Sequence, residues 1–244
     1  MTARAFDGRT LLVVGGTSGF GREVAHRAAD AGARLVVVGR DEAKLHRVLA
    51  DLRAAGATVD GHALDVTDDG ALAELVAGSG PVDHVVSTVG GAMGGGFLDA
   101  PWGTIRAAVE EKLFDNLRLA RAVAPRVTDG GSMVFTAGTG GRPEGASGAV
   151  VGNQAIGTMV RGLAAELAPR RVRVNAVAPT WTPTPLWRDV PEAEVARTRA
   201  DMSAVIPLGR TATVAEVADA YLFLLSHTFV TGHTLPVDGG MHLV

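Results

Sequence analysis

The chain has 244 residues, of which 47% are hydrophobic and 20% charged, and its formal net charge is −3. This balance supplies a sizeable buried core but no basic excess, so neither nucleic acid nor a membrane surface is an expected partner. With no cysteine, disulfides and thiolate metal sites are excluded, and no metal site is predicted. No signal-like segment and no apolar run of about 20 residues is present, which predicts a cytoplasmic protein.

Short apolar runs alternate with helical patterns along the whole chain. In chain order, the first half predicts strands at 10–14, 34–38, 58–64 and 82–88, with helices at 19–31, at 41–55 and from Asp68 or Asp69 toward Val76. The second half predicts a helical segment over 102–127, strands at 132–137, 172–177 and 233–237, and helices at 148–167 and 214–225. The pattern indicates an α/β fold of the Rossmann type: a doubly wound parallel sheet of about seven strands with helices on both faces.

No internal repeat, low-complexity tract or linker divides the sequence. We therefore expect one dinucleotide-binding domain over residues 1–244. The segment 180–207 is the least regular and is rich in proline, which predicts a mobile flap over a substrate site.

A glycine-rich loop follows the first predicted strand and opens the first predicted helix. Its glycines at 15, 19 and 21 allow a tight turn and close approach of a pyrophosphate, and the helix N-terminus offers free N–H groups. A merely tight turn is the alternative. The loop residues expected to contact a nucleotide are Gly15, Thr17, Ser18, Gly19, Phe20 and Gly21.

The residue after the second strand determines whether the site favours an adenosine ribose with a 2′-phosphate, as in NADP(H), or without one, as in NAD(H). Arg40 comes first there, and a basic residue accommodates a 2′-phosphate, so NADP(H) is favoured over NAD(H). The alternative is that Arg40 is a solvated surface charge. Asp41 is expected to cap the next helix.

Several motifs together identify the chain as similar to the short-chain dehydrogenase/reductase family over nearly its whole length. They are the loop at 15–21, Leu64-Asp65-Val66, the segment 87–90, the run 173–179, Thr184-Pro185-Leu186 and the C-terminal stretches at 207–210, 231–232 and 237–240. The resemblance implies a homo-oligomer (dimer or tetramer) and further cofactor contacts at Asp65, Val66, Val89, Gly90, Asn153, Pro179, Thr180 and Thr184.

The resemblance also implies a catalytic asparagine, serine, tyrosine and lysine, with the tyrosine as the acid. Counting from the flanking motifs places the tyrosine position at Ala149 and the lysine position at Asn153. The asparagine position is Lys112, with Asn116 one turn later, and the serine position falls within Thr136–Thr139, with Gly138 as the preferred residue. All four positions depart from the family pattern, which predicts altered chemistry.

Four polar residues are the candidates for the altered site: Lys112, Thr136, Thr139 and Asn153. A threonine could hydrogen-bond a substrate oxygen, and the amide of Asn153 could hold a ribose hydroxyl. For Lys112 the alternative is an exposed ion pair with Glu110, Glu111 or Asp115. A substrate that needs little protonation, such as an iminium or a quinone, is a further possibility.

The substrate pocket is predicted from residues near these positions: Met93, Glu144, Trp181 and Trp187. Trp181 offers a stacking surface, although both tryptophans could simply pack within the flap. The sequence thus predicts an NADP(H)-dependent oxidoreductase with a non-standard proton route, acting on a small organic substrate, with bulky aromatic, quinone-like and imine compounds as the candidate classes. The alternatives are a non-redox enzyme, such as a cyclase, isomerase or dehydratase, and a cofactor-binding protein without catalysis.

Overall fold

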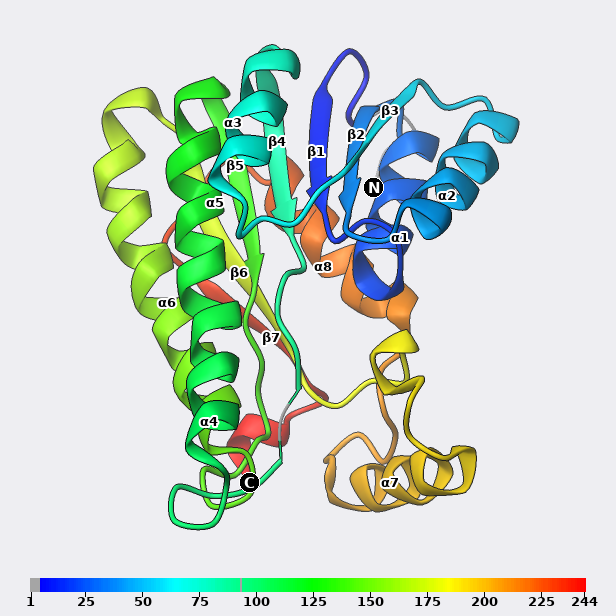
Figure 1. The fold of residues 1–244 in the computed structure, drawn as a ribbon, viewed down its shortest axis with the longest axis vertical. Helices are drawn as coiled ribbons and strands as arrows, with labels where there is room; N and C mark the ends of the chain where they lie inside the picture. The colour runs from blue at the N-terminus through cyan, green and yellow to red at the C-terminus, as the bar shows by residue number, and fades with distance from the viewer. Residues whose placement is uncertain (1–4, 93) are drawn as a thin grey trace.

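The computed structural model describes residues 5–92 and 94–244 and forms one seven-stranded sheet in the order β3-β2-β1-β4-β5-β6-β7 (Figure 1). All neighbouring strands run parallel. The strands are β1 (Thr10–Val14), β2 (Arg34–Gly39), β3 (Val59–Ala63), β4 (Val82–Ser87), β5 (Val127–Thr136), β6 (Arg173–Pro179) and β7 (Thr234–Val237). The doubly wound parallel sheet predicted from the sequence is confirmed.

Helices cover both faces of the sheet because alternate strand residues point to opposite sides. Leu11 and Val13 belong to a core with α1 (Gly19–Asp30), α2 (Glu42–Ala54) and α8 (Val214–Ser226). Leu12 and Val14 belong to a second core with α3 (Asp69–Gly78), α5 (Asp115–Val123) and α6 (Ser147–Leu167). Two buried layers of this kind explain why the central strand β1 and its neighbour β2 are almost wholly apolar.

Side-chain caps fix where several helices begin. The Asp41 carboxylate accepts from the Lys44 backbone N–H at the start of α2, as predicted. Asp68, rather than Asp69, caps α3 by accepting from the first-turn N–H groups. Thr213 opens α8 with a reciprocal capping box.

The segment predicted as helical over 102–127 is helical from Trp102 to Arg126, but it consists of four consecutive pieces rather than one regular α-helix. They are α4 (Trp102–Val109), a π-helical turn (Glu110–Phe114), α5 and a 3-10 turn (Ala124–Arg126). The next strand was predicted to begin at Ser132 but begins at Val127, which pairs with Val82 ahead of a register shift. The Thr-Asp-Gly-Gly sequence after Val127 resembles a turn, which hid this strand from the sequence pattern.

The segment 180–207 contains more regular structure than its sequence predicted. A 3-10 turn (Pro185–Trp187) is followed by α7 (Glu192–Val205), in which no residue is buried. Without an apolar stripe, α7 gives no periodic signal. Figure 1 shows α7 beyond the carboxyl ends of the strands, apart from the helices that cover the sheet. Across the described residues, no helix is long and apolar enough to cross a membrane.

Candidate functional site

The predicted site residues gather at the carboxyl edge of the sheet. Strands β1 and β4 are neighbours, but the chain proceeds from β1 toward one edge of the sheet and from β4 toward the other. Such a switch point leaves a crevice outside the strand ends, where open α/β sheets bind ligands. The loops after β1, β4, β5 and β6 border this crevice.

The glycine-rich loop after β1 has the close contacts expected of a phosphate cradle. Gly15 has a φ of +83°, and a Cβ there would lie 2.3 Å from Thr88 Oγ1. A Cβ on Gly21 would lie 2.4 Å from the Gly15 carbonyl oxygen. Ser18 makes no side-chain cap and the first turn of α1 has no acidic residue, so its N–H groups suit an anion. The loop therefore fits a dinucleotide phosphate.

The other loop residues approach the crevice in different ways. Thr17 lies against the end of β2, where a Cβ on Gly39 would meet its Cγ2 at 2.4 Å. Phe20 packs against the core with α1, so its side chain is structural. Thr184 lies across the loop, its Cβ 3.8 Å from the Cβ position of Gly19, and its hydroxyl accepts from the Leu186 N–H.

At the adenosine end, Arg40 has 79% of its side chain exposed and lies 3.7 Å from a carboxylate oxygen of Asp65. The Thr67 backbone N–H, with a smaller contribution from Arg40, holds the pKa of Asp65 below its usual value. Val66 is buried in the core beneath. This loose pairing leaves the Arg40 guanidinium available to an incoming anion.

Lys112 is a buried charged residue whose amine lies at the carboxyl end of β5. It is the middle residue of the π-helical turn and is only 7% exposed. Its Nζ donates to the Thr136 carbonyl oxygen at 3.2 Å. Burial lowers its pKa to about 8, although the Glu111 carboxylate acts to raise it. Among the described residues Lys112 forms no ion pair, so the exposed pairing considered from the sequence is not what the fold provides.

Two glycines make room for this lysine. A Cβ on Gly152 would lie 2.8 Å from Lys112 Cβ, and a Cβ on Gly90 would lie 2.8 Å from its Nζ. Gly90 also has a φ of +132°, which few side chains adopt. The lysine stem therefore fills a slot between α6 and the loop after β4, whose Val89 packs on the core.

Thr136 turns its hydroxyl away from the crevice. Its Oγ1 donates to the Ser87 carbonyl oxygen at 2.8 Å and hydrogen-bonds the Tyr221 hydroxyl at 2.6 Å. Tyr221 is fully buried, and burial raises the pKa of its phenol. The chain's one tyrosine therefore belongs to the core, and Thr136 offers the crevice its carbonyl rather than its hydroxyl.

Asn153 lies on α6 beside the loop after β5. A Cβ on Gly138 would lie 2.6 Å from Asn153 Nδ2, so the small residue at 138 accommodates the amide. The Oδ1 atom of Asn153 and the Oγ1 atoms of Thr139 and Thr180 are all buried without a hydrogen-bond partner among the described residues. Buried polar atoms of this kind require a ligand or water to satisfy them.

Thr139 and Pro179 tie the loops after β5 and β6 together. The Thr139 N–H donates to the Pro179 carbonyl oxygen at 3.0 Å. Burial acts to raise the pKa of Asp238, but hydrogen bonds from His242 and Gly240 lower it overall. The Thr139 Oγ1 atom is buried without a hydrogen-bond partner among the described residues, so its hydroxyl remains available to a ligand or water.

The predicted pocket residues lie on the surrounding loops. Trp181 and Trp187 stack on each other at 5.7 Å and 26°, and Trp187 Nε1 donates to the Thr182 carbonyl oxygen at 3.0 Å. Each tryptophan is partly exposed, so the stacked pair presents aromatic surface to solvent. Glu144 is exposed, and its backbone carbonyl lies against Gly96. Met93 lies outside the described residues.

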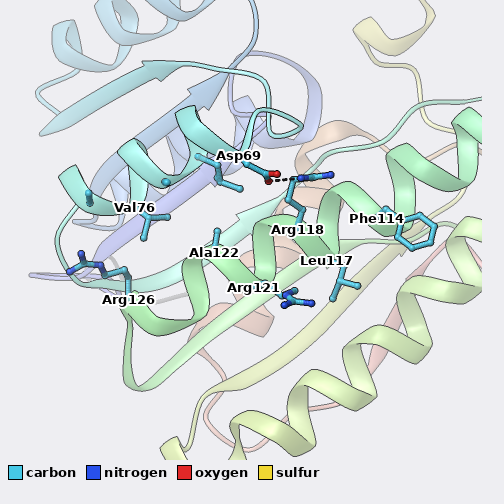
Figure 2. A pocket seen from close by; sticks show the side chains of 11 residues that line it. Asp69, Val76, Phe114, Leu117, Arg118, Arg121, Ala122 and Arg126 are labelled. Atoms are coloured by element: carbon cyan, nitrogen blue, oxygen red, sulfur yellow. Dashed lines mark hydrogen bonds and ion pairs between the residues drawn. The ribbon is translucent and has the colours of Figure 1, made fainter.

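A separate groove of about 650 Å³ lies between α3 and α5, away from this crevice. Figure 2 shows Asp69 and Arg118 paired across it, with Arg121 and Arg126 along its α5 side. None of the residues predicted for cofactor or catalysis lines it. The described residues also contain no group of three or more His, Asp or Glu that could hold a metal ion.

Comparisons with known proteins agree with this dinucleotide-binding architecture. The sequence model described as enoyl-(acyl carrier protein) reductase matches residues 14–242. The galactitol 2-dehydrogenase (L-tagatose-forming) of Cereibacter sphaeroides is 36% identical, covering 98% of this chain and 97% of that protein. The L-xylulose reductase of Bos taurus is 32% identical over 96% of each chain. A 3-oxoacyl-[acyl-carrier protein] reductase from Brucella melitensis, solved with bound NAD, superposes with a TM-score of 0.86 at 28% identity and covers 99% and 94% of the two chains.

The fold and crevice define an NAD(P)-dependent oxidoreductase, and the chain belongs to the short-chain dehydrogenase/reductase family. Counting from the flanking motifs assigns the family's asparagine position to Lys112 and its lysine position to Asn153, and this assignment stays a prediction. Sequence reasoning did not find the role of Gly152. An isolated glycine inside a strong helix pattern was the available signal.

Proposed function

We propose that the protein is an NADP(H)-dependent oxidoreductase that interconverts a carbonyl and a secondary alcohol, with Lys112 as its proton donor and acceptor. The observation that carries the proposal is the Lys112 amine, buried at the carboxyl end of β5 with a pKa of about 8. General acid–base catalysis works best when the pKa of the catalytic group lies near the working pH. No tyrosine is available at position 149 to do this.

The residues present fit a bound nicotinamide cofactor, whose chemistry is to give or take a hydride at the substrate carbon. The glycine-rich loop would hold its phosphates, and Asn153 Oδ1 and Thr180 Oγ1 would gain the partners they lack. During reduction, the Lys112 ammonium passes a proton to the substrate oxygen and becomes a neutral amine. That amine then recovers a proton from water. Oxidation uses the neutral amine to take the alcohol proton.

The preference for NADP(H) rests on Arg40. Its guanidinium follows β2 directly, is largely exposed and has only a long contact with Asp65. A 2′-phosphate offers it a shorter, charge-assisted hydrogen bond than that carboxylate does. The substitution Arg40→Ala, with KM measured for NADPH and for NADH, tests this preference.

The charge of Lys112 restricts the substrate. An ammonium beside the reacting centre repels a cationic iminium and stabilises an oxygen that becomes negative during reduction. The relatives named for galactitol and L-xylulose support a hydroxylated ketone or polyol as the substrate class. The stacked Trp181 and Trp187 suit the apolar face of a ring or sugar. Because the relatives are named dehydrogenases and reductases, a non-redox enzyme or a silent binding protein is less well supported.

The remaining expectations concern the whole protein. We propose that residues 1–244 act as one domain and that segment 180–207, with the exposed α7, closes over bound substrate. A homodimer or homotetramer and a cytoplasmic location are proposed on the family's general behaviour and on the sequence. Sedimentation of the purified protein tests the assembly.

The direct test is cofactor turnover with ketoses, cyclic ketones, quinones and imines, comparing wild type with Lys112→Met. Loss of the acid should lower kcat/KM for carbonyl reduction by roughly 10²–10⁴-fold. Because the pKa falls from 10.5 to about 8, removing the buried charge should also stabilise the fold at pH 7, by at most about 3 kcal/mol. A variant that is more stable yet inactive supports the proposal. Full activity in Lys112→Met, or turnover of imines alone, contradicts it.

A further inference from the structure

Lys112 belongs to a closed ring of buried hydrogen bonds. Its Nζ donates to the Thr136 carbonyl oxygen at 3.2 Å, and the Thr136 hydroxyl donates to the Ser87 carbonyl oxygen at 2.8 Å. The Ser87 hydroxyl donates to Asn116 Oδ1 at 2.6 Å, and Asn116 Nδ2 donates back to the Lys112 carbonyl oxygen at 2.7 Å. The ring thus starts at the amine of Lys112 and returns to its backbone.

We propose that Asn116, anchored by Ser87, is the positioning residue that holds the Lys112 amine at the end of β5. This inference rests on the proposed proton transfer by Lys112. Asn116 and Ser87 are fully buried, so in this proposal they act only through the lysine.

The first argument is the shape of the helix at Lys112. The Asp115 N–H bonds to the Glu110 carbonyl, five residues back, which defines a π-helical turn. Such turns are rare inside α-helices and shift the side chains and carbonyls that follow. Asn116 Nδ2 bonds the carbonyl of Lys112 at the centre of this turn. The Asn116 amide therefore stabilises the turn at Lys112, the residue whose side-chain direction places the amine.

The second argument is that Asn116 joins both walls of the lysine slot. It is fully buried, and its Nδ2 also donates to the Val89 carbonyl oxygen at 3.3 Å. Val89 precedes Gly90, against which the Lys112 amine lies. One amide thus fixes the spacing between the loop after β4 and the π-helical turn.

The third argument is that a buried polar ring costs stability unless every member is satisfied. Ser87 and Asn116 are both fully buried, and each hydroxyl or amide group in the ring has a partner. The elements around the amine contribute Gly90, Thr136 and Gly152, none of which titrates. Glu111, on the same turn as Lys112, is the one charge shown to act on it.

Ser87→Ala and Asn116→Ala test the inference, with Ser132→Ala as the matched control. Ser132 is an equally buried strand serine whose hydroxyl bonds His84 Nδ1 at 2.8 Å, outside the ring. The chain has two lysines, so NMR of lysine-labelled protein follows the amine of Lys112 with Lys44 as internal reference. Opening the ring should hydrate the amine and raise its pKa by about one unit or more. The control should lose similar stability without that shift.

Kinetics then distinguish the two proposals. In the Lys112→Met background, Asn116→Ala should cause no further loss of kcat, because its effect passes through the lysine. If both ring variants leave the Lys112 pKa and the pH profile at wild-type values, the positioning role is wrong although the catalytic role stands. If the pKa shifts while carbonyl reduction is unchanged, the positioning role holds and the catalytic role of Lys112 fails.

Discussion

The substitution Gly152→Ala separates the fit of Lys112 from the general stability of α6. The added Cβ would lie 2.8 Å from Lys112 Cβ, 3.0 Å from its Cγ and 3.4 Å from the Ala108 carbonyl oxygen. The first two contacts are to atoms close to the backbone, so the π-helical turn must shift. Alanine gains about 1 kcal/mol over glycine in a helix, whereas overpacking costs about 1–3 kcal/mol. The expected net change is a destabilisation of about 0–2 kcal/mol.

The effect on catalysis should be larger than this change in stability. A misplacement of about 1 Å can cost 10²-fold in rate, so kcat for carbonyl reduction should fall about 10²-fold. Gly162→Ala is the control on the same helix, because a Cβ at Gly162 meets nothing within 4 Å. It should stabilise the protein by about 1 kcal/mol and leave kcat unchanged. Urea unfolding and cofactor oxidation rates measure both quantities.

The proposed role of Gly152 is wrong if Gly152→Ala keeps wild-type kcat and the expected free energy of unfolding. That result would mean that the slot between α6 and the π-helical turn does not fix the amine. Equal losses of kcat in the two glycine variants would point instead to a general disturbance of α6.

Three further substitutions test other parts of the site. Arg40→Ala should raise KM for NADPH about tenfold or more, because one charge-assisted hydrogen bond to the 2′-phosphate is lost, and should leave KM for NADH unchanged. Equal effects on both cofactors would contradict the preference for NADP(H). Tyr221→Phe removes the buried bond to Thr136 and should cost about 1 kcal/mol in urea unfolding while the pH profile is kept; loss of activity would show that this tyrosine is catalytic. Asn153→Lys should lower kcat by placing a second ammonium near Lys112. The double variant Asn153→Lys, Lys112→Asn should not restore kcat, because position 149 still holds alanine and no acid. If this double variant recovers wild-type kcat, Lys112 is not the proton donor.

Local sequence patterns were sufficient for the sheet and the phosphate loop. Strand hydrophobicity and glycine spacing are properties of neighbouring residues, and the glycines at 15 and 21 occupy the tight contacts that their spacing predicted. The helix α7 was not predicted, because none of its residues is buried and its sequence therefore has no apolar residues at helical spacing.

The surroundings of the candidate site could not be predicted from the sequence. The burial of Lys112 depends on Gly90 and Gly152, which only the fold brings together, and its assignment to the family's asparagine position stays a prediction. Likewise, the sequence predicts that the Thr136 hydroxyl binds a substrate oxygen, whereas in the fold it hydrogen-bonds the hydroxyl of Tyr221, 85 residues away. Tertiary contacts of this kind leave no periodic trace in a sequence.

The pH dependence of kcat/KM, measured in both directions for wild type and Lys112→Met, tests the central assignment most directly. A Lys112 pKa of about 8 requires the ammonium for reduction and the neutral amine for oxidation. Carbonyl reduction should therefore fall, and alcohol oxidation rise, as the pH passes through about 8, and both transitions should be absent in Lys112→Met. Transitions that persist in the variant would contradict the account.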